Sequence, residues 1–564
     1  MTSRRTFLQQ AAATSAALSL PPSAASSMVS RDDTGAASFV DLRRAPDLVA
    51  LQTDTGLRTL PRQGEGRWSD AQSEIGYIAG SSAQTVRLTT SLPSLLRLKL
   101  RWHATIPDSV RVMGDAWERG YGELEWRGLV PDRLMPWYCA VHDGARTHGY
   151  GVRTGPKAMC AWQVDAHGIT LWADVRSGGV GLELGKRTLD VCEVVSRAGA
   201  PGVSPFAALR AFCKALCPAP RMPAAPVYGH NDWYWAYGKN SAESVRVDAK
   251  RIVELSPTGA NRPFAVIDDG WQPGRVTSDD GNGYWDKGNE NFPDMAALTA
   301  DIRKAGARPG IWCRPLLAHH DAPDTLRMSR DRSVLDPTVP AVMQKVHDDI
   351  ARIAGWGYDL IKHDYSTWDI FGRWGFQMGA ALTRGGWRFA EGNGRTTAEV
   401  IDAFYATIRQ AAGDAIVIGC NTVSHLSAGR FEVYRIGDDS SGSDWGRTRR
   451  MGINSLAFRA AQHGTFYGAD PDCVGVLKEQ SWPLIRQWLD LLARSGTVLM
   501  TSIEPGALGP EQKRDVMAAL AIAAAPQPLA EPLDWQRLVY PAHWRLMGAE
   551  RAFDWASAEG EQGV

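Results

Sequence analysis

The chain lacks an excess of charge of either sign. Lys and Arg together number 62, and Asp and Glu together number 62, so the formal net charge of the 564 residues is zero. Proteins that bind nucleic acid carry surplus positive charge to meet the phosphate backbone. The balance therefore argues against a nucleic-acid partner, and against a protein with an acidic or basic tail.

Long apolar runs are also lacking. Beyond the N-terminal segment, no stretch approaches the roughly 18 consecutive apolar residues of a membrane-spanning helix. There is no internal repeat and no long low-complexity segment. Apolar residues make up 44% and charged residues 22%, the balance of a folded globular protein. We therefore expect a folded protein with no membrane partner.

Signatures of metal and cofactor binding are missing as well. The eight cysteines do not form paired CxxC motifs, and no phosphate loop or dinucleotide fingerprint follows a predicted strand. His319, His320 and Asp321 resemble a metal cluster, but adjacent histidines rarely share one ion. We expect no metal and no cofactor, and cysteines that are mostly buried thiols, with disulfides left open.

The N-terminus carries an export pattern. Arg4 and Arg5 precede a mildly apolar stretch at residues 11–20, and small residues follow at 23–25. The apolar stretch is too short to span a membrane. The pattern predicts a twin-arginine signal peptide over residues 1–27, which would send the folded protein to the periplasm or the exterior.

Tryptophan is the one residue type in unusual supply. The chain has 22 Trp but only 14 Tyr and 14 Phe. An indole offers a flat apolar face and one N–H donor. One interpretation is a core rich in large side chains, and the other is a binding site for a ligand with flat, half-apolar faces, such as a sugar.

Four regions follow the signal peptide and a polar linker. Residues 38–205 contain short alternating apolar runs separated by Gly, Asp and Pro, which predict an antiparallel β-sandwich. Residues 206–226 are a helical and Pro-rich linker. Residues 227–525 alternate strands with helices, including capping signals at Asp294 and Thr396, and predict a (β/α)₈ barrel. Residues 526–564 are a short C-terminal extension. The eight predicted strands are residues 227–229, 264–267, 309–312, 360–362, 415–418, 433–436, 464–467 and 497–500.

Polar and aromatic side chains gather where these strands end, which is the active-site face of such a barrel. Any one carboxylate there could instead be a helix cap or an ion-pair partner. Carboxylates accept hydrogen bonds from hydroxyls and indoles cover apolar ring faces, so the set suits a carbohydrate ligand. Its members, in strand order, are Trp233, Asp268, Asp269, Trp271, Trp312, Arg314, Lys362, Asp364, Arg435, Asp438, Asp439, Asp470 and Asp472.

Two carboxylates are enough to hydrolyse a glycoside, if one stays ionised and the other carries a proton. Lys362 precedes Asp364 by two residues on a strand, so both point to the same side and the cation favours the ionised carboxylate. Asp364 is therefore the candidate nucleophile. Asp438 or Asp439, after the sixth strand, is the candidate acid/base.

At these residues the chain resembles the retaining α-galactosidases of glycoside hydrolase families 27 and 36. The matching motifs are Ile267-Asp-Asp-Gly-Trp271, Lys362-x-Asp364 and Arg435-x-Gly-Asp438, with a Trp after the first strand and Asp470-Pro-Asp472 after the seventh. The β-rich region before the barrel is similar to family 36 rather than to family 27. The resemblance covers about residues 38–505.

The resemblance implies a role for each matching residue. Asp364 would form a covalent glycosyl-enzyme, and Asp438 would be the acid/base, with Asp439 as the fallback. Asp268 and Asp269 would bind the 4- and 6-hydroxyls of galactose. The remaining substrate-binding candidates are Lys362 and Arg435, which would hold hydroxyls and tune the nucleophile, Trp233, which would stack on the sugar, and Trp271.

Departures from the family pattern leave the sugar open. His363 stands where the family commonly has Trp or Tyr, the loop 439–445 is longer, and the C-terminal β-domain of the family is short or absent. Arg314 is an unexpected cation that could meet an anionic or differently oriented group of the substrate. The alternatives are an α-N-acetylgalactosaminide or a β-L-arabinopyranoside as the substrate, or a decayed barrel that only binds carbohydrate.

Overall fold

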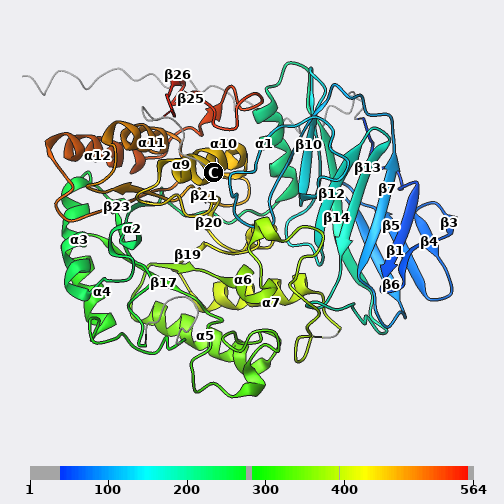
Figure 1. Ribbon diagram of the computed structural model, residues 1–564, viewed down its shortest axis with the longest axis horizontal. Helices are drawn as coiled ribbons and strands as arrows, with labels where there is room; N and C mark the ends of the chain where they lie inside the picture. The colour runs from blue at the N-terminus through cyan, green and yellow to red at the C-terminus, as the bar shows by residue number, and fades with distance from the viewer. Residues whose placement is uncertain (1–38, 275–282, 393, 557–564) are drawn as a thin grey trace, which may run out of the picture. The chain divides into compact units, whose positions relative to one another are not determined.

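The computed structural model describes residues 39–274, 283–392 and 394–556. The predicted signal peptide, residues 1–27, lies outside the described residues. The described chain begins with two antiparallel sheets, continues through a long helix into a parallel sheet, and ends in a small antiparallel sheet (Figure 1).

The first two sheets fill the region predicted to be a sandwich. One sheet has the order β2-β1-β7-β13-β12-β9 and the other has the order β3-β4-β5-β6-β14-β11-β10-β8. Tyr77 of β5 meets Trp102 of β7 with ring centroids 5.8 Å apart, so the two sheets face each other. The strands are β1 (Leu48–Thr53), β2 (Gly56–Thr59), β3 (Arg62–Gly64), β4 (Arg67–Ser69), β5 (Ser73–Ala79), β6 (Gln84–Thr90), β7 (Arg97–His103), β8 (Arg111–Gly114), β9 (Met135–Pro136), β10 (Tyr138–His142), β11 (Thr147–Val152), β12 (Met159–Asp165), β13 (Gly168–Asp174) and β14 (Leu189–Ala198).

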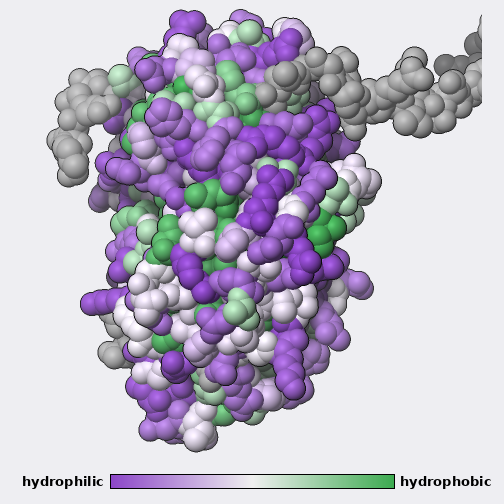
Figure 2. All heavy atoms as spheres, turned by 90° about the vertical axis from the view of Figure 1, so that its right-hand side faces the viewer, coloured by the Kyte–Doolittle hydropathy of each residue, from purple (hydrophilic) through white to green (hydrophobic). Residues whose placement is uncertain are grey.

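Alternation along these strands explains the pairing. In β6 every second side chain is buried and those between are partly or fully exposed, as expected of a sheet with one face in a core. The outward faces are polar. Figure 2, which views the molecule from the sandwich side, shows a mainly hydrophilic surface on which apolar residues form only scattered patches.

The predicted linker begins with α1 (Pro205–Leu216). The Ser204 side chain caps this helix by accepting the Ala207 N–H at 3.2 Å. Phe212 presses on Gly149 of β11, where an added Cβ would lie 2.3 Å from the ring, so only glycine fits there. The helix is thus packed on the sandwich and does not act as a spacer between the sandwich and the parallel sheet.

The second half of the chain forms a sheet of nine strands that are all parallel, with helices between most of them. Its order is β21-β20-β19-β18-β17-β16-β15-β23-β22. Its strands are β15 (Tyr228–Asn231), β16 (Phe264–Ile267), β17 (Arg308–Cys313), β18 (Leu360–His363), β19 (Ile416–Gly419), β20 (Val433–Arg435), β21 (Gly468–Asp470), β22 (Cys473–Val476) and β23 (Leu499–Ile503).

The first and last strands of this order are neighbours in the chain. β21 pairs with β20 and β22 pairs with β23, and only Pro471 and Asp472 separate them. Asp472 has a left-handed backbone, with φ of 86°, which breaks the strand in two. The seventh strand in chain order is therefore divided into β21 and β22, which lie at the two edges of the sheet.

The bounds predicted for the seventh strand, residues 464–467, are wrong. That segment is a turn that begins at Gly464, whose φ is 71°, and the strand starts at Gly468. Phe466 and Tyr467 are nonetheless buried, with exposed fractions of 1% and 0%. Burial in a turn produced the same apolar pattern that a short buried strand produces.

The long helices of this region are α3 (Ala242–Leu255), α4 (Met295–Ala305), α5 (Pro340–Gly355), α7 (Thr397–Ala411), α11 (Trp482–Arg494) and α12 (Pro510–Ala523). Two predicted caps are confirmed. Asp294 accepts the Ala297 N–H at 2.9 Å, and Thr396 with Glu399 forms a capping box on α7. The short helices are α2 (Trp233–Ala236), η1 (Asp324–Leu326), α6 (Ser366–Phe371), η2 (Gly375–Gln377), α8 (Ser424–Ser427), α9 (Trp445–Arg447), the π-helix η3 (Thr448–Asn454), α10 (Ser455–Arg459) and η4 (Ala460–Gln462).

The predicted short extension contains a three-stranded antiparallel sheet of β24 (Glu531–Pro532), β25 (His543–Leu546) and β26 (Ala549–Ala552). All eight cysteines are buried free thiols, as the sequence predicts. In the described part of the chain, no helix has the length and apolar character needed to cross a membrane.

Candidate active site

Asp364 lies directly after β18, at the carboxyl end of the parallel sheet. The alternation of the strand sends its neighbour His363 the other way, into an aromatic cage of Phe404, Tyr405 and Phe431, where burial lowers the pKa of His363 to about 3. Tyr365, the next residue, has a left-handed backbone with φ of 65°. Such conformations are costly outside glycine and often mark functional turns.

Three N–H groups hold the carboxylate of Asp364. The indole of Trp312 donates to Oδ2 at 3.0 Å, and the backbone N–H groups of Tyr365 and Asn421 donate to Oδ1 at 2.7 and 3.1 Å. Burial works to raise the pKa of Asp364, but Lys362, Arg119 and the Trp312 donor outweigh it, so its pKa lies below the ordinary value. The group is ionised and fixed in orientation, as a nucleophile requires.

Lys362 makes its direct contact with a different carboxylate. Its Nζ lies 2.7 Å from Oδ2 of Asp268, which also accepts the side-chain amide of Asn231 at 2.7 Å. Asn231 in turn accepts the backbone N–H of the half-buried Trp233 at 3.0 Å. The ends of β15, β16 and β18 are thereby joined, and Asp268, Lys362 and Trp233 come together as the sequence predicts.

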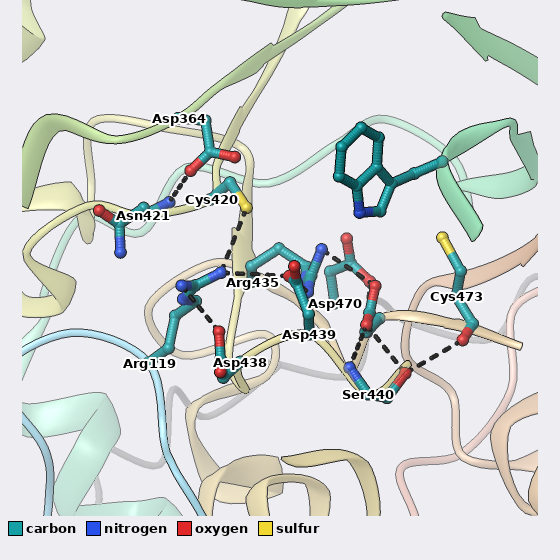
Figure 3. Close-up of polar contacts among 12 residues, drawn as sticks. Arg119, Asp364, Cys420, Asn421, Arg435, Asp438, Asp439, Ser440, Asp470 and Cys473 are labelled. Carbon is teal, nitrogen blue, oxygen red and sulfur yellow. Dashed lines mark hydrogen bonds and ion pairs between the residues drawn. The ribbon is translucent and has the colours of Figure 1, made fainter. Parts of the chain in front are cut away.

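The two acid/base candidates stand in different surroundings. Both oxygens of Asp438 are taken by guanidinium groups, with Arg119 at 2.8 Å from Oδ1 and Arg447 at 2.7 Å from Oδ2. Asp439 accepts from Arg435 at 3.0 Å and from Arg119 at 3.4 Å, both through Oδ1. No hydrogen bond to its other oxygen is made by the described residues, and 42% of its side chain is exposed. Figure 3 shows Asp438 in contact with Arg119, and Asp439 beside Arg435.

Electrostatics also separate the two. The charge of Asp439 acts on Asp364, where it works to raise the pKa. Burial works to raise the pKa of Asp439 itself, but Arg435, Arg119 and Lys362 hold it well below the ordinary value. Both oxygens of Asp438 are held by arginines, whereas Asp439 has one oxygen that accepts no hydrogen bond from the described residues, so the geometry leaves the fallback Asp439 better placed than Asp438 to meet a substrate oxygen.

Arg435 links the ends of β20 and the divided seventh strand. It lies 3.0 Å from Asp472, whose other oxygen accepts the N–H and the hydroxyl of Ser440 at 2.7 and 2.8 Å. Burial raises the pKa of nearby Asp470 to about 6. The predicted set of Arg435, Asp470 and Asp472 is thus gathered beside Asp439.

Arg119 and Glu118 were missed by the sequence reasoning. Both belong to the segment that follows β8 of the sandwich, and Arg119 lies 3.8 Å from Cys420 as well as against the two aspartates. Glu118 accepts the side-chain amide of Asn421 at 2.9 Å. No local signal marks their roles, because Asp439 lies 320 positions from Arg119 and Asn421 lies 303 positions from Glu118.

Trp271 does not line the site, and its prediction as a substrate-binding residue is corrected. The side chain is completely buried, and its indole donates to the backbone oxygen of Trp312 at 2.9 Å. Trp285 and Trp356 pack against it. Trp271 therefore packs in the core and bonds to the backbone of β17, and its place after a strand end in the sequence does not distinguish this role from a place in the site.

Arg314 is also corrected. Its guanidinium forms a buried ion pair with Asp369 of α6 at 2.7 Å, and stacks over the ring of Tyr365 at 4.4 Å. Its charge is thus neutralised within the protein. Asp269 stays at the surface of the cluster, half-buried, and accepts the side-chain amide of Gln272 at 2.6 Å.

No group of three or more His, Cys, Asp or Glu side chains in the described ranges is placed to hold a metal ion. His320 instead lies 2.8 Å from Asp321 in an exposed pair. The site offers carboxylates, cations and indoles, which can bind hydroxyls and transfer protons.

Comparison by sequence gives no relative. No family model matches the chain, and no curated protein matches it.

Comparison of structures gives many matches. The chain is similar to the α-galactosidase TtGalA from Thermus thermophilus, solved with p-nitrophenyl α-D-galactopyranoside, at 19% identity and a TM-score of 0.57, over 90% of this chain and 98% of that one. It is also similar to the family 36 α-galactosidase AgaA from Geobacillus stearothermophilus, at 15% identity and a TM-score of 0.54, over 92% and 80% of the two chains. A third match is the galactosidase domain of the α-galactosidase-sucrose kinase AgaSK, at 15% identity and a TM-score of 0.53, over 84% and 73%. At these identities the likeness establishes the fold: this chain has the fold of the family 36 α-galactosidase structures.

Proposed function

We propose that this chain is a retaining exo-α-galactosidase. The observation that carries the proposal is the pair of ionisable carboxylates, Asp364 after β18 and Asp439 after β20, set among hydroxyl-binding groups in a fold shared with α-galactosidases. The similar enzyme TtGalA has been solved in complex with p-nitrophenyl α-D-galactopyranoside and with stachyose. Asp268, Asp269, Lys362, Arg435 and Trp233 would bind the sugar.

The reaction proceeds in two displacements. Asp364 attacks the anomeric carbon, and the leaving oxygen takes a proton from Asp439. A water molecule then gives a proton to Asp439 and attacks the same carbon, which releases Asp364 and galactose with its original configuration. Because cations hold Asp439 ionised, we expect the first step to need acidic pH and the rate to fall as pH rises.

No specific observation favours a second sugar. The departures that leave another sugar open are Arg314 and the longer loop 439–445, and of these Arg314 pairs with Asp369. A barrel that only binds carbohydrate would need neither a fixed, ionised Asp364 nor an acidic partner beside it. Both outcomes are covered by one panel of aryl glycosides, in which turnover of the α-galactoside above all others supports the proposal.

Azide tests the two roles separately. Asp364→Ala should lose activity and, with azide, form the galactosyl azide of inverted configuration. Asp439→Ala should lose roughly 10²–10⁴-fold on substrates with poor leaving groups and form the azide with retained configuration. Asp402→Asn is a matched control, because Asp402 pairs with Arg430 on a half-exposed surface. Full activity in Asp364→Ala would contradict the assignment.

We further propose export by the twin-arginine route. The proposal rests on Arg4 and Arg5, on the apolar stretch at residues 11–20 and on the small residues at 23–25. Replacing both arginines with Lys should leave the protein in the cytoplasm of an expressing bacterium, whereas export that continues would contradict it.

A further inference from the structure

One segment of the sandwich reaches across to the parallel sheet. It comprises residues 115–120, directly after β8, and we call it the crossing segment. Its first residue, Asp115, pairs with Arg459 at 2.7 Å, with both side chains at most 1% exposed. At its other end, the Gly120 N–H donates to Ile436 at 2.8 Å and its oxygen accepts the Asp438 N–H at 2.9 Å. The segment is therefore held at one end by Arg459 of α10 and at the other end by the residues after β20 that include the acid/base candidates.

Glu118, within the crossing segment, is connected to the candidate nucleophile Asp364 through Asn421. Its Oε2 accepts the side-chain N–H of Asn421 at 2.9 Å, and the backbone N–H of Asn421 donates to Oδ1 of Asp364 at 3.1 Å. Its Oε1 accepts the Gly375 N–H at 2.9 Å and also contacts the Tyr121 hydroxyl. The side chain is fully buried, and burial raises its pKa to about 7. A buried acid with every oxygen occupied fixes what it touches.

Arg119, the next residue, contacts both acid/base candidates. It lies 2.8 Å from Asp438 and 3.4 Å from Asp439, and only 7% of its side chain is exposed. Arg447 completes the arrangement by binding the far oxygen of Asp438 and, at 2.7 Å, the backbone oxygen of Asp439. Asp438 is thus an anchor between two arginines, and the anchored backbone sets where the Asp439 side chain stands.

We propose that Glu118 and Arg119 are positioning residues for the two catalytic carboxylates, so that the sandwich supplies part of the active site. Two consecutive side chains divide the task, one acting on Asp364 through Asn421 and the other on Asp439 directly and through Asp438. The inference rests on the proposed function, since it presumes that these aspartates are catalytic.

A positioning role for Arg119 has a signature in the pH dependence. The groups that face Asp439 are Arg435, Arg119, Lys362 and Arg447, and those that face Asp364 are Lys362, Arg119 and Asp439. Arg119 lowers the pKa of both Asp439 and Asp364, and among the described residues it contacts none of those proposed to bind the sugar. Its loss should move both limbs of the kcat/KM profile to higher pH, by about one unit for a charge at this distance. A residue that only stabilised the fold would leave both limbs in place.

The test compares Arg119→Met, Arg119→Lys and the control Arg101→Met in the full chain, with an aryl α-galactoside as probe. Arg101 is also a mostly buried arginine of the sandwich, and its guanidinium bonds to Asp165 and Thr170, both of the sandwich. We expect Arg119→Met to shift both limbs upward and to lose activity, and Arg119→Lys to restore the limbs while kcat stays low. The control should keep the wild-type profile and rate.

Glu118→Gln tests the other half. The side-chain NH2 group of the introduced glutamine must face one of two N–H donors, that of Asn421 or that of Gly375, so one of these contacts is lost and the hold on Asn421 is weakened. We expect kcat to fall about tenfold or more with little change in KM, because the sugar contacts are intact. Wild-type limbs in both Arg119 variants, or wild-type kcat in Glu118→Gln, would overturn the inference. If Arg119→Met does not fold, the Arg119→Lys variant decides by itself: a wild-type pH profile together with a wild-type kcat would overturn the inference. A wild-type enzyme without activity on any glycoside would instead reject the proposed function.

Discussion

Replacing Arg459 with Met should be among the most destabilising single changes in this protein. Arg459 donates to Asp115 at 2.7 Å, to the Ile436 oxygen at 3.0 Å and to the Ala116 oxygen at 3.3 Å, and its side chain has no exposed area. Methionine fills a similar volume and removes the charge. Asp115 would keep one donor, the side-chain amide of Gln462 at 2.9 Å.

The magnitude can be worked out from burial. Breaking a buried ion pair from one side costs about 3–5 kcal/mol, because the remaining charge stays buried without its partner. At about 1.4 kcal/mol for each factor of ten, this lowers the folding equilibrium constant by roughly two to four powers of ten. An exposed pair offers the contrast: Arg430→Met, which separates Arg430 from Asp402 at side-chain exposures of 42% and 34%, should cost under about 1 kcal/mol.

Urea unfolding of the wild type, Arg459→Met and Arg430→Met measures the difference. A third variant, Arg459→Met with Asp115→Leu, removes both charges and should recover part of the loss. The reasoning is refuted if Arg459→Met unfolds at the same urea concentration as Arg430→Met. It is refuted as well if the double variant is less stable than Arg459→Met.

Two further outcomes are expected. Burial raises the pKa of Asp232 to about 8, above the 3.8 of the free side chain, so between these values the folded protein holds the proton and the unfolded chain has lost it. The free energy of unfolding of the wild type should therefore fall, relative to that of Asp232→Asn, as pH rises from about 4 to about 8. A difference between the two proteins that does not change with pH would contradict this expectation. Trp233→Ala should raise KM for an aryl α-galactoside about threefold to tenfold, because one stacking face is lost. Trp271→Phe should leave this KM unchanged and lower the melting temperature in thermal unfolding, because Trp271 is completely buried.

The sequence predicted the elements whose signals are local. β16 was placed correctly over residues 264–267, because a fully buried run there is followed at once by two aspartates and a glycine. The caps at Asp294 and Thr396 were also correct, since a cap involves residues only three positions apart. Asp364 could be singled out because the two-residue spacing from Lys362 is a property of the strand.

The features that the sequence could not predict depend on distant partners. The charge of Arg314 looked available because its partner Asp369 lies 55 positions further on. The resemblance ranks Asp438 before Asp439, and nothing in the local sequence shows that Arg119 of the sandwich lies against both. A side chain next to a strand end can point to either side of the sheet, and periodicity does not say on which side Trp271 lies.

The crossing segment also constrains the order of events during synthesis. Arg119 and Asp439 are 320 positions apart, and Asp115 and Arg459 are 344 apart. At roughly 5–20 residues per second, the crossing segment leaves the ribosome some 16 to 70 seconds before these partners do. Until then Asp115 lacks Arg459 and Glu118 lacks Asn421, so both carboxylates must stay in water. The active site is therefore completed late, and hydrolytic activity reports that nearly the whole chain has been made and folded.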